Sequence, residues 1–278
     1  MRFTKMHGTG NDYIYINGFE TKVENPAELA IKMSRSHFGI GSDGLILIHP
    51  AEGADARMEM YNADGSRAEM CGNGIRCVAK YLYDNGIRRN NPLRIQTDAG
   101  IKTLDLFLDQ GHVAQVQVNM GIPELKTEKI PAKFQPSQTV LAPFGILDQE
   151  FRVTLVNMGN PHCVIFIEDP LEQLDLFRYG PVIENHPNFP NRTNVEFVNV
   201  VNRQKVIQRT WERGSGETLA CGTGACAVCV AGQLIGQTDS RITVQLKGGT
   251  LELEWRNRQQ VLMTGNAVKI FEGDWPEG

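Results

Sequence analysis

The motif CGNG at residues 71–74 returns as CGTG at residues 221–224, so that two cysteines followed by glycines stand 150 positions apart. An aromatic residue, Tyr61 or Trp211, lies ten positions before each cysteine, and a Gly-Ser pair follows that aromatic residue in both cases. A repeat of this kind indicates that one structural unit occurs twice in the chain. The fold is therefore predicted to consist of two related halves.

Further segments repeat in the same order at nearly the same separation. Gly10-Asn11 is matched by Gly159-Asn160, and each pair leads into an apolar run that is typical of a buried strand. Residues 45–48 match residues 195–198 in the same way. Several matches in one order are not expected by chance, so they support the prediction of a duplicated unit.

Strands and helices can be placed within the halves. Residues 113–120, 242–246 and 251–255 alternate apolar and polar side chains, as half-buried strands do. Helical periodicity follows each Cys-Gly motif instead, and the second of these helices is apolar nearly all round, which predicts that it is buried. Two more helix starts are predicted at NPAE (25–28) and DPLE (169–172), each with an Asn or Asp cap followed by proline.

These elements predict an α+β fold of two pseudo-symmetric domains, each a curved, barrel-like and mostly antiparallel sheet around a central helix. The first domain is expected to span residues 1–122 and to be completed by the C-terminal segment 265–278. The second is expected to span residues 123–264. A stretch that carries Pro131, Pro136 and Pro143 is expected to join the repeated segments loosely.

Composition argues against several classes of function. The 278 residues are 41% apolar and 22% charged with a net charge of −4, which is typical of a globular protein without a basic stripe for nucleic acid. No apolar run is long enough to cross a membrane, and the N-terminus lacks a signal-peptide pattern. A cytoplasmic location is expected, where the six cysteines would be thiols, metal ligands or nucleophiles rather than disulfides.

Cys71 and Cys221 are candidate catalytic residues because each precedes a predicted helix. The first turn of a helix presents N–H groups and the positive end of the helix dipole, which stabilise a thiolate and bind a carboxylate. The pKa of each thiol is therefore expected to fall below its usual value. Two such thiols can act as base and acid on opposite faces of one carbon, as inversion of an amino acid without pyridoxal phosphate requires.

Polar residues beside the repeated segments are candidate substrate contacts. The asparagines among them are Asn11, Asn62, Asn160 and Asn194. An asparagine next to glycine is also a common turn residue, so both interpretations stay open. Arg213, which follows Glu212, can clamp a carboxylate or form a surface ion pair, and His162 is either a neighbour that tunes a thiol or a strand-end histidine.

Long motifs in both halves resemble those of the diaminopimelate epimerase family. They are HGTGND at 7–12, NADGS at 62–66, MCGNGIR at 70–76, GNPH at 159–162 and ERGSGETLACGTG at 212–224. The resemblance extends over nearly the whole chain. It implies two similar domains with the active site in the cleft between them, no cofactor or metal, and interconversion of LL- and meso-diaminopimelate on the route to lysine and peptidoglycan.

The resemblance also implies a role for each candidate residue. Cys71 and Cys221 would be the base and the acid, while His162 and Glu212 would tune the thiols. Substrate would be held by side chains of Asn11, Asn62, Asn160, Asn194, Glu212 and Arg213, and by the backbone at Gly72, Asn73, Gly222 and Thr223. Besides the small-molecule substrate, the expected partner is a second copy of the chain in a homodimer.

Two departures from the family pattern and two alternatives bear on this interpretation. Some members carry glutamine where this chain has Gly44, and some carry tyrosine near the dimer contact where it has Phe271. One alternative is a proline or hydroxyproline racemase of the same fold, whose substrates have no distal amino-acid group for Arg213 to hold. The other is a metal-binding or redox protein built on Cys226 and Cys229, although this C-x-x-C pair lies in a predicted apolar helix.

Overall fold

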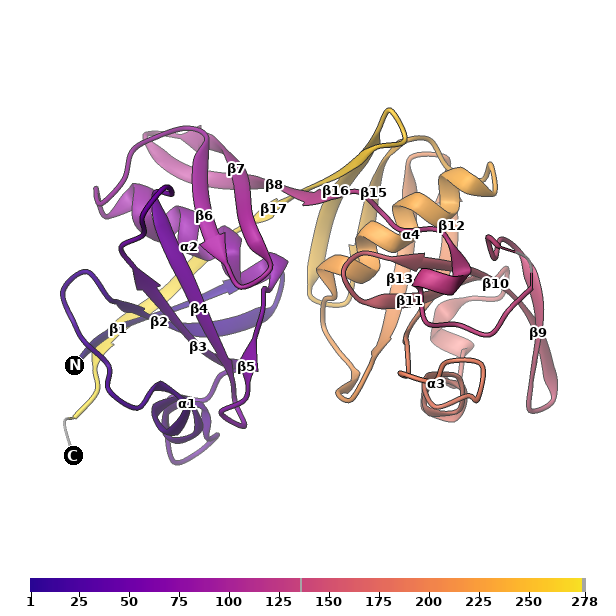
Figure 1. Cartoon of the computed structure of the whole chain (residues 1–278), viewed down its shortest axis with the longest axis horizontal. Helices are drawn as coiled ribbons and strands as arrows, with labels where there is room; N and C mark the ends of the chain where they lie inside the picture. Colours follow the sequence, from indigo (N-terminus) through magenta and orange to yellow (C-terminus); the bar gives the residue numbers. More distant parts are fainter. Residues whose placement is uncertain (136, 277–278) are drawn as a thin grey trace. The chain divides into compact units, whose positions relative to one another are not determined.

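The computed structural model describes residues 1–135 and 137–276, and the chain divides into two compact units (Figure 1). The first unit comprises Met1–Asn119 with Thr264–Gly278, and the second comprises Met120–Met263. Pro136 of the predicted joining stretch and residues 277–278 of the predicted C-terminal segment lie outside the described residues.

The first unit is built on a curved sheet. Its strands are β1 (Arg2–Gly8), β2 (Asn11–Asn17), β3 (Gly44–His49), β4 (Ala56–Asn62), β5 (Arg67–Ala68), β6 (Leu93–Thr97), β7 (Gly100–Asp109), β8 (His112–Gly121) and β18 (Val268–Asp274). Hydrogen-bonded neighbours follow the order β18-β1-β2-β3-β4-β6-β7-β8, with β5 beside β4. The pairs β2–β3 and β4–β6 are parallel, and the other pairs are antiparallel.

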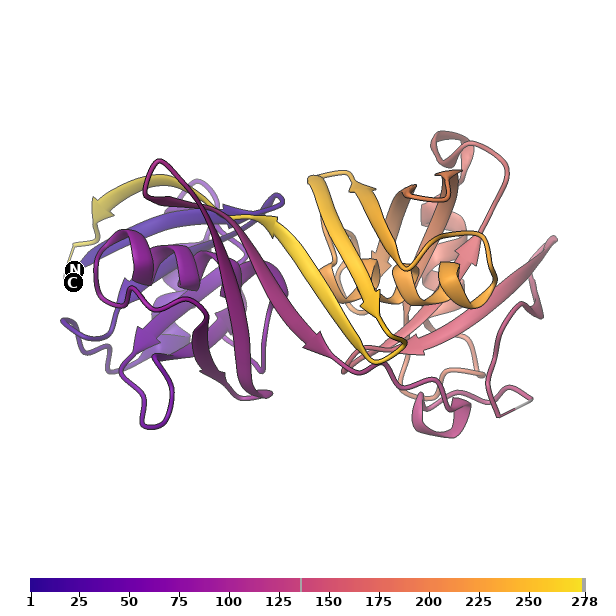
Figure 2. The same cartoon turned by 90° about the horizontal axis from the view of Figure 1, so that it is seen from above.

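Helix α2 (Gly72–Asp84) lies within the curve of this sheet (Figures 1 and 2). It contacts β1, β2, β6 and β7. Its apolar stripe Ile75, Val78, Ala79 and Leu82 is fully buried, as the predicted periodicity required. The helix ends at Asn85-Gly86, where Gly86 adopts φ +72° and reverses the chain. Helix α1 (Pro26–Ser34) packs on β3 and β4.

The second unit has a sheet of the same kind. Its strands are β9 (Ala142–Ile146), β10 (Gln149–Asn157), β11 (Pro161–Phe166), β12 (Asn194–Asn202), β13 (Lys205–Glu212), β14 (Gly216–Glu217), β15 (Arg241–Leu246) and β16 (Gly249–Arg256), together with β17 (Gln260–Asn266), whose last three residues belong to the first unit. Neighbours follow the order β9-β10-β11-β12-β13-β15-β16, with β14 beside β13. The pairs β11–β12 and β13–β15 are parallel.

Helix α4 (Gly222–Leu234) is the central helix of this unit and contacts β10, β11, β12, β15 and β16. Every residue from Ala225 to Ala231 is fully buried, which confirms the prediction drawn from its apolar composition. A second helix, α3 (Leu176–Glu184), contacts β9, β12, β13 and β14. The single turns η1 (Thr127–Lys129) and η2 (Leu171–Gln173) complete the unit.

The duplication seen in the sequence is present element by element. The order β1-β2-β3-β4-β6-β7 around α2 corresponds to β10-β11-β12-β13-β15-β16 around α4, and the parallel pairs fall at the same two places. The register agrees as well, because Tyr13 pairs with Gly44 in the first unit and His162 pairs with Asn194 in the second. The predicted α+β class with two similar halves is confirmed.

One predicted helix start is wrong. The quartet at residues 169–172 leads only into the turn η2, and the helix begins later, at Leu176. Asp175 supplies the cap instead, because its side chain accepts a hydrogen bond from the N–H of Arg178 at 3.1 Å. The earlier turn is held to β12 by a 3.0 Å bond from the N–H of Leu171 to Asn199 Oδ1.

The stretch expected to join the halves loosely is folded into the second unit. Ile130 is fully buried there, and the ring of Phe134 packs against Phe144 and Phe189 with centroids 5.2 and 5.5 Å away. The prolines of this stretch suggested a linker, but its scattered aromatic side chains provide the packing. No helix in the described part of the chain has the length and apolar character needed to cross a membrane.

Candidate active site

Cys71 occupies the N-cap of α2. Its backbone is extended, and its Sγ accepts a hydrogen bond from the N–H of Gly74 at 3.4 Å. The following residues Gly72, Asn73 and Gly74 are buried in the first turn. The thiol is half-buried and faces the positive end of the helix dipole, as the motif predicted.

Asn11 links this thiol to a carboxylate. The thiol of Cys71 donates to Asn11 Oδ1 at 3.2 Å, and Asn11 Nδ2 donates to Asp43 Oδ2 at 2.6 Å. The N–H of Asp12 donates to the same carboxylate oxygen at 3.0 Å. Burial raises the pKa of Asp43, while the bonds from Asp12 and Asn11 act in the opposite direction. Asp43 therefore orients the Asn11 amide so that its oxygen meets the thiol.

Arg76 joins the turn that carries Asn11 to the helix that carries Cys71. Its guanidinium is fully buried and donates to Thr9 Oγ1 at 2.8 Å, to the carbonyl of Gly72 at 3.2 Å and to that of Asn266 at 3.1 Å. β1 can lie this close to the helix because Gly8 has no side chain: a Cβ there would stand 2.8 Å from the carbonyl oxygen of Asn73. The buried arginine thus fixes the position of the helix start.

We expect Arg76→Met to lower the free energy of unfolding by about 3 kcal/mol, because it leaves two buried oxygens, those of Thr9 and Gly72, and the carbonyl of Asn266 without their donor. Urea unfolding of the purified variant measures this loss. Arg94→Met is the matched control, since Arg94 is an exposed residue of β6. Equal stability of the two variants would contradict the structural role assigned to Arg76.

Cys221 occupies the corresponding N-cap of α4. Its Sγ accepts from the N–H of Gly224 at 3.4 Å and lies 3.5 Å from Thr223 Oγ1. The residue is only 5% exposed, so it is more deeply buried than Cys71. The two halves therefore present the same thiol at the same helix position, in different surroundings.

Two carboxylates lie near Cys221, and a histidine pairs with one of them. Glu212, at the end of β13, lies within hydrogen-bonding reach of the thiol and accepts from Thr218 Oγ1 at 2.5 Å. Glu196 on β12 is fully buried and lies 2.7 Å from Nδ1 of His162 on β11. The other ring nitrogen, Nε2, lies 2.9 Å from Asn160 Oδ1. His162 is fully buried and hydrogen bonded on both sides.

The expected fall in the pKa of both thiols is wrong for Cys221. Burial, together with the negative charges of Glu212 and Glu196, raises the pKa of this thiol well above its usual range. The bonds from Thr223 and Gly224 favour the thiolate but do not outweigh these causes. Burial also raises the pKa of Glu212. In the absence of substrate, Cys221 is a protonated thiol.

We expect iodoacetamide to alkylate Cys71 well before Cys221 at neutral pH, because Cys221 is both more buried and protonated. Mass spectrometry of peptides from a time course measures each cysteine separately. Labelling of Cys221 should accelerate as the pH rises toward its raised pKa. Faster labelling of Cys221 than of Cys71 at pH 7 would contradict this account.

The remaining predicted side chains lie at turns and strand ends. Asn62 ends β4 and donates to Ser66 Oγ at 2.9 Å, which is a turn interaction. Asn194 is buried, donates to the carbonyl of Pro161 at 2.8 Å and accepts from the N–H of Arg213 at 2.9 Å. The guanidinium of Arg213 is exposed and donates to the carbonyl of Asn191 at 3.1 Å. Among the described residues, that guanidinium bonds to a carbonyl rather than to a carboxylate.

Gly44 has no space for a side chain. A Cβ at this position would stand 2.1 Å from the carbonyl oxygen of Tyr61 on the adjacent strand β4. The glutamine found in some members therefore requires a different local backbone. Gly44 is also the counterpart of Asn194, because Gly44 pairs with Tyr13 of β2 and Asn194 pairs with His162 of β11 at the corresponding place in the repeat.

The rival metal or redox site has no support in the described residues. Cys226 and Cys229 are fully buried within α4, and burial raises the pKa of Cys229 to about 12. Burial likewise raises the pKa of Cys77 to about 11. All six cysteines lie in the described residues, and none of them forms a disulfide. No group of three or more His, Cys, Asp or Glu side chains within residues 1–135 and 137–276 is arranged to hold a metal ion.

Sequence reasoning missed Asp43, Arg76 and Glu196. Asp43 lies one residue before Gly44 in a loop whose role was not evident, and Glu196 sits between the buried apolar residues Val195 and Phe197. A charged residue inside a buried strand is itself a signal, because carboxylates are seldom buried without a partner. The contacts of all three residues depend on segments far apart in the chain.

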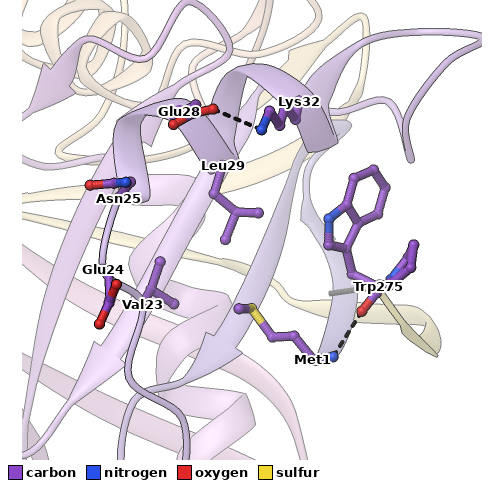
Figure 3. A pocket seen from close by; sticks show the side chains of 9 residues that line it. Met1, Val23, Glu24, Asn25, Glu28, Leu29, Lys32 and Trp275 are labelled. Atoms are coloured by element: carbon purple, nitrogen blue, oxygen red, sulfur yellow. Dashed lines mark hydrogen bonds and ion pairs between the residues drawn. The ribbon is translucent and has the colours of Figure 1, made fainter. Parts of the chain in front are cut away.

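An open apolar hollow of about 430 Å³ lies elsewhere on the first unit. Figure 3 shows Met1, Val23, Leu29 and Trp275 around it, with Glu28 and Lys32 paired at its rim at 2.7 Å. The N-terminal amine closes one side by donating to the carbonyl of Trp275 at 2.8 Å. Its lining includes none of the residues predicted for the site.

Comparison with known sequences gives a consistent result. Residues 3–126 and 154–270 match the sequence model of diaminopimelate epimerase. The chain is 54% identical over 275 residues to the diaminopimelate epimerase of Acetivibrio thermocellus, covering 99% of this chain and 98% of that protein. The diaminopimelate epimerase of Desulfovibrio desulfuricans is 50% identical over 282 residues, covering 99% of this chain and 98% of that protein. That of Methanococcus maripaludis is 48% identical over 275 residues, covering 99% of both chains.

Solved structures of lower sequence similarity share the fold. A hydroxyproline epimerase from Agrobacterium vitis matches with a TM-score of 0.70 at 17% identity, over 98% of this chain and 91% of that one. A methylitaconate-delta-isomerase matches with a TM-score of 0.63 at 13% identity, over 98% and 97% of the two chains. At these identities the likeness concerns the fold alone.

Proposed function

Because the chain belongs to the diaminopimelate epimerase family, we propose that it interconverts LL- and meso-diaminopimelate by a two-base mechanism without pyridoxal phosphate. The observation that carries this proposal is the duplicated helix-start thiol. Cys71 and Cys221 each cap a helix and each accept from the N–H three residues further on, at 3.4 Å in both cases. The reaction supplies a step in the synthesis of lysine and of peptidoglycan precursors, and we propose a cytoplasmic location for it.

Inversion needs a base on one face of the α-carbon and an acid on the other. In the proposed reaction one cysteine, as thiolate, removes the α-proton while the other, as thiol, delivers a proton to the opposite face. The roles exchange in the reverse direction. The protonated state of Cys221 in the substrate-free protein supports its part as the acid in one direction.

The α-proton of an amino acid is weakly acidic, so the charge that develops on the adjacent carboxylate must be stabilised. We assign this task to the first turns of the helices, with backbone N–H groups at Gly72, Asn73, Gly222 and Thr223. Such groups are fixed in place before reaction and lie at the positive end of a helix dipole. Support comes from the glycines in both turns, which let a ligand approach the backbone.

We assign the remaining contacts to polar side chains near the two thiols. Those proposed to hold substrate are Asn11, Asn62, Asn160, Asn194, Glu212 and Arg213. Asn11 bonds the thiol of Cys71, Glu212 lies within reach of Cys221, and Asn160 bonds His162, which supports a place for these three beside the reacting carbon. The exposed guanidinium of Arg213 is suited to a carboxylate at the far end of the substrate.

The proposal is tested by incubating the purified protein with LL-diaminopimelate in deuterated water without added cofactor. We expect meso product that carries deuterium at the inverted α-carbon, detected by isomer-resolved chromatography and mass spectrometry. Parallel incubations with L-proline and trans-4-hydroxy-L-proline test the rival racemase activity. Absence of diaminopimelate conversion, or faster conversion of a proline, would overturn the proposal.

We also propose that the protein is a homodimer. Strand β18 pairs with β1, and its side chains Ile270 and Phe271 are 50% and 45% exposed. Exposed apolar strands near a sheet edge are commonly covered by a partner, which supports an interface there. Sedimentation equilibrium of the wild type and of Phe271→Asp tests this, with a wild-type monomer as the contradicting result.

A further inference from the structure

Glu196 occupies a position where the fold itself does not require a carboxylate. Its Oε1 packs against the first turn of α4. The closeness is such that a Cβ added to Gly224 would stand only 2.6 Å from this oxygen. In the other half, a Cβ on Gly74 would stand 2.7 Å from Cδ1 of Ile46. Ile46 and Glu196 are counterparts in the repeat, so the same fold accepts an apolar side chain under the same helix turn.

A buried carboxylate at this place carries a cost that an isoleucine does not. Glu196 is fully buried, and its Oε2 has no hydrogen-bond partner among the described residues. Unpaired buried carboxylate oxygens destabilise a protein by several kcal/mol in typical cases. Retention of such a group beside a thiol points to a role in the chemistry of that thiol.

The contacts of Glu196 define that role. Its Oε1 lies 2.7 Å from Nδ1 of His162, whose counterpart in the first half is Tyr13. A histidine bonded to a carboxylate through Nδ1 has a fixed ring orientation and a fixed tautomer. The second ring nitrogen is thereby directed to Asn160 at 2.9 Å.

Charged and titratable groups from three strands cluster around the Cys221 thiol and Glu196. β13 brings Glu212, β12 brings Glu196, and β11 brings His162 and Cys163 beside Glu196. The negative charge of Glu196 acts on Cys221, on Glu212 and on Cys163, in each case against the charged form of that group. Glu196 is thus the shared charge of the cluster.

We propose that Glu196 is a positioning residue for the C-terminal thiol, because it fixes the ring of His162 and places a carboxylate under the helix turn that Cys221 caps. It makes the two thiols unequal before substrate arrives, so that Cys221 meets the substrate as a thiol. The chemical use of this asymmetry rests on the proposed function. The effect of Glu196 on the protonation of Cys221 does not rest on the proposed function, because it can be measured on the protein without substrate.

The experiment compares wild type, Glu196→Gln and Glu196→Ile by alkylation with iodoacetamide between pH 6 and 10, followed by mass spectrometry of each cysteine. Glutamine keeps an acceptor for His162 and removes the charge, while isoleucine is the residue that the other half carries. We expect Cys221 to be alkylated about tenfold faster in Glu196→Gln at pH 8, with its profile moved toward lower pH, because a buried like charge has been removed. The profile of Cys71 should stay unchanged.

Folding and the matched control are read in the same experiment. Buried Cys226 stays unlabelled in a folded protein, and Glu252→Gln removes an exposed carboxylate that pairs with Arg241 at 3.0 Å, so it should leave both profiles as in wild type. If Cys226 becomes labelled in Glu196→Gln, that variant is not properly folded and Glu196→Ile is used in its place. The same acceleration of Cys221 labelling is expected in Glu196→Ile. An unchanged Cys221 profile in a variant that keeps Cys226 protected would overturn the proposal.

Turnover gives a second readout. Glu196→Gln, which preserves the bond to His162, is expected to retain more of kcat than Glu196→Ile, and its pH dependence should shift in the same direction as the labelling of Cys221. Equal kcat and equal pH dependence of both variants and wild type would overturn the positioning role. A wild-type protein that does not turn over diaminopimelate would refute the proposed function, while the labelling result would still test Glu196.

Discussion

Replacement of either Cys71 or Cys221 by alanine is expected to lower kcat for diaminopimelate epimerisation by roughly 10³-fold, the range typical for loss of a general acid or base. Each cysteine serves one face of the α-carbon, so neither can substitute for the other in a reaction that needs both. The loss should appear in both reaction directions. Steady-state assays on LL- and meso-diaminopimelate measure it, and circular dichroism shows whether the fold is retained.

The buried cysteines provide matched controls for this prediction. Cys226→Ala and Cys77→Ala remove the same side chain from the same two helices, at positions that are fully buried within each unit. We expect them to keep kcat within about twofold of wild type and to lose some stability, because only a small packing contribution is removed. Normal turnover by Cys71→Ala or Cys221→Ala would refute the two-base mechanism.

Arg213→Ala is expected to lower kcat/KM by roughly 10²-fold, because a substrate carboxylate would lose its charged partner. The helix starts hold the reacting end in the proposed complex, so the arginine would act on the distant end. Exchange of the α-proton with solvent should therefore persist at high substrate concentration. Arg213→Lys should rescue the loss only partly, since a point charge does not reproduce the planar guanidinium.

Arg203→Ala is the control for Arg213, because Arg203 is also exposed but bonds Asp239 at 2.8 Å. It should keep wild-type kcat/KM on both isomers. If Arg213→Ala behaves in the same way as Arg203→Ala, then Arg213 is a surface residue that holds the carbonyl of Asn191. Recognition of the distal carboxylate would then need another residue.

Much of the chemistry around the thiols could not be predicted from local patterns. Asp43 and Asn11 are 32 positions apart, and Glu196 and His162 are 34 apart, yet each pair is hydrogen bonded because parallel strands bring them to one edge. Spacing along the chain contains no direct signal for such pairs. The raised pKa of Cys221 has the same origin, since burial and two carboxylates from other strands outweigh the local effect of the helix start.

The sequence by itself determined the duplication, the two central helices and the identity of the paired thiols. These features depend on short-range properties: an N-cap cysteine followed by glycines, the apolar stripe of α2 and the largely apolar sequence of α4. Their physical basis is local, because capping and helical periodicity involve residues within about one or two turns. The misplaced helix start at residues 169–172 marks the limit of this reasoning, since a second cap at Asp175 competed with the first.

Only the tertiary structure decided how the two thiols differ. Both cap a helix with the same local geometry, but the residue beneath the first turn is Ile46 in one unit and Glu196 in the other. The energy of a charge depends on its burial and on every neighbouring charge, whatever their separation along the chain. Long-range packing therefore sets the protonation of Cys221, although the local sequence sets its position at the helix start.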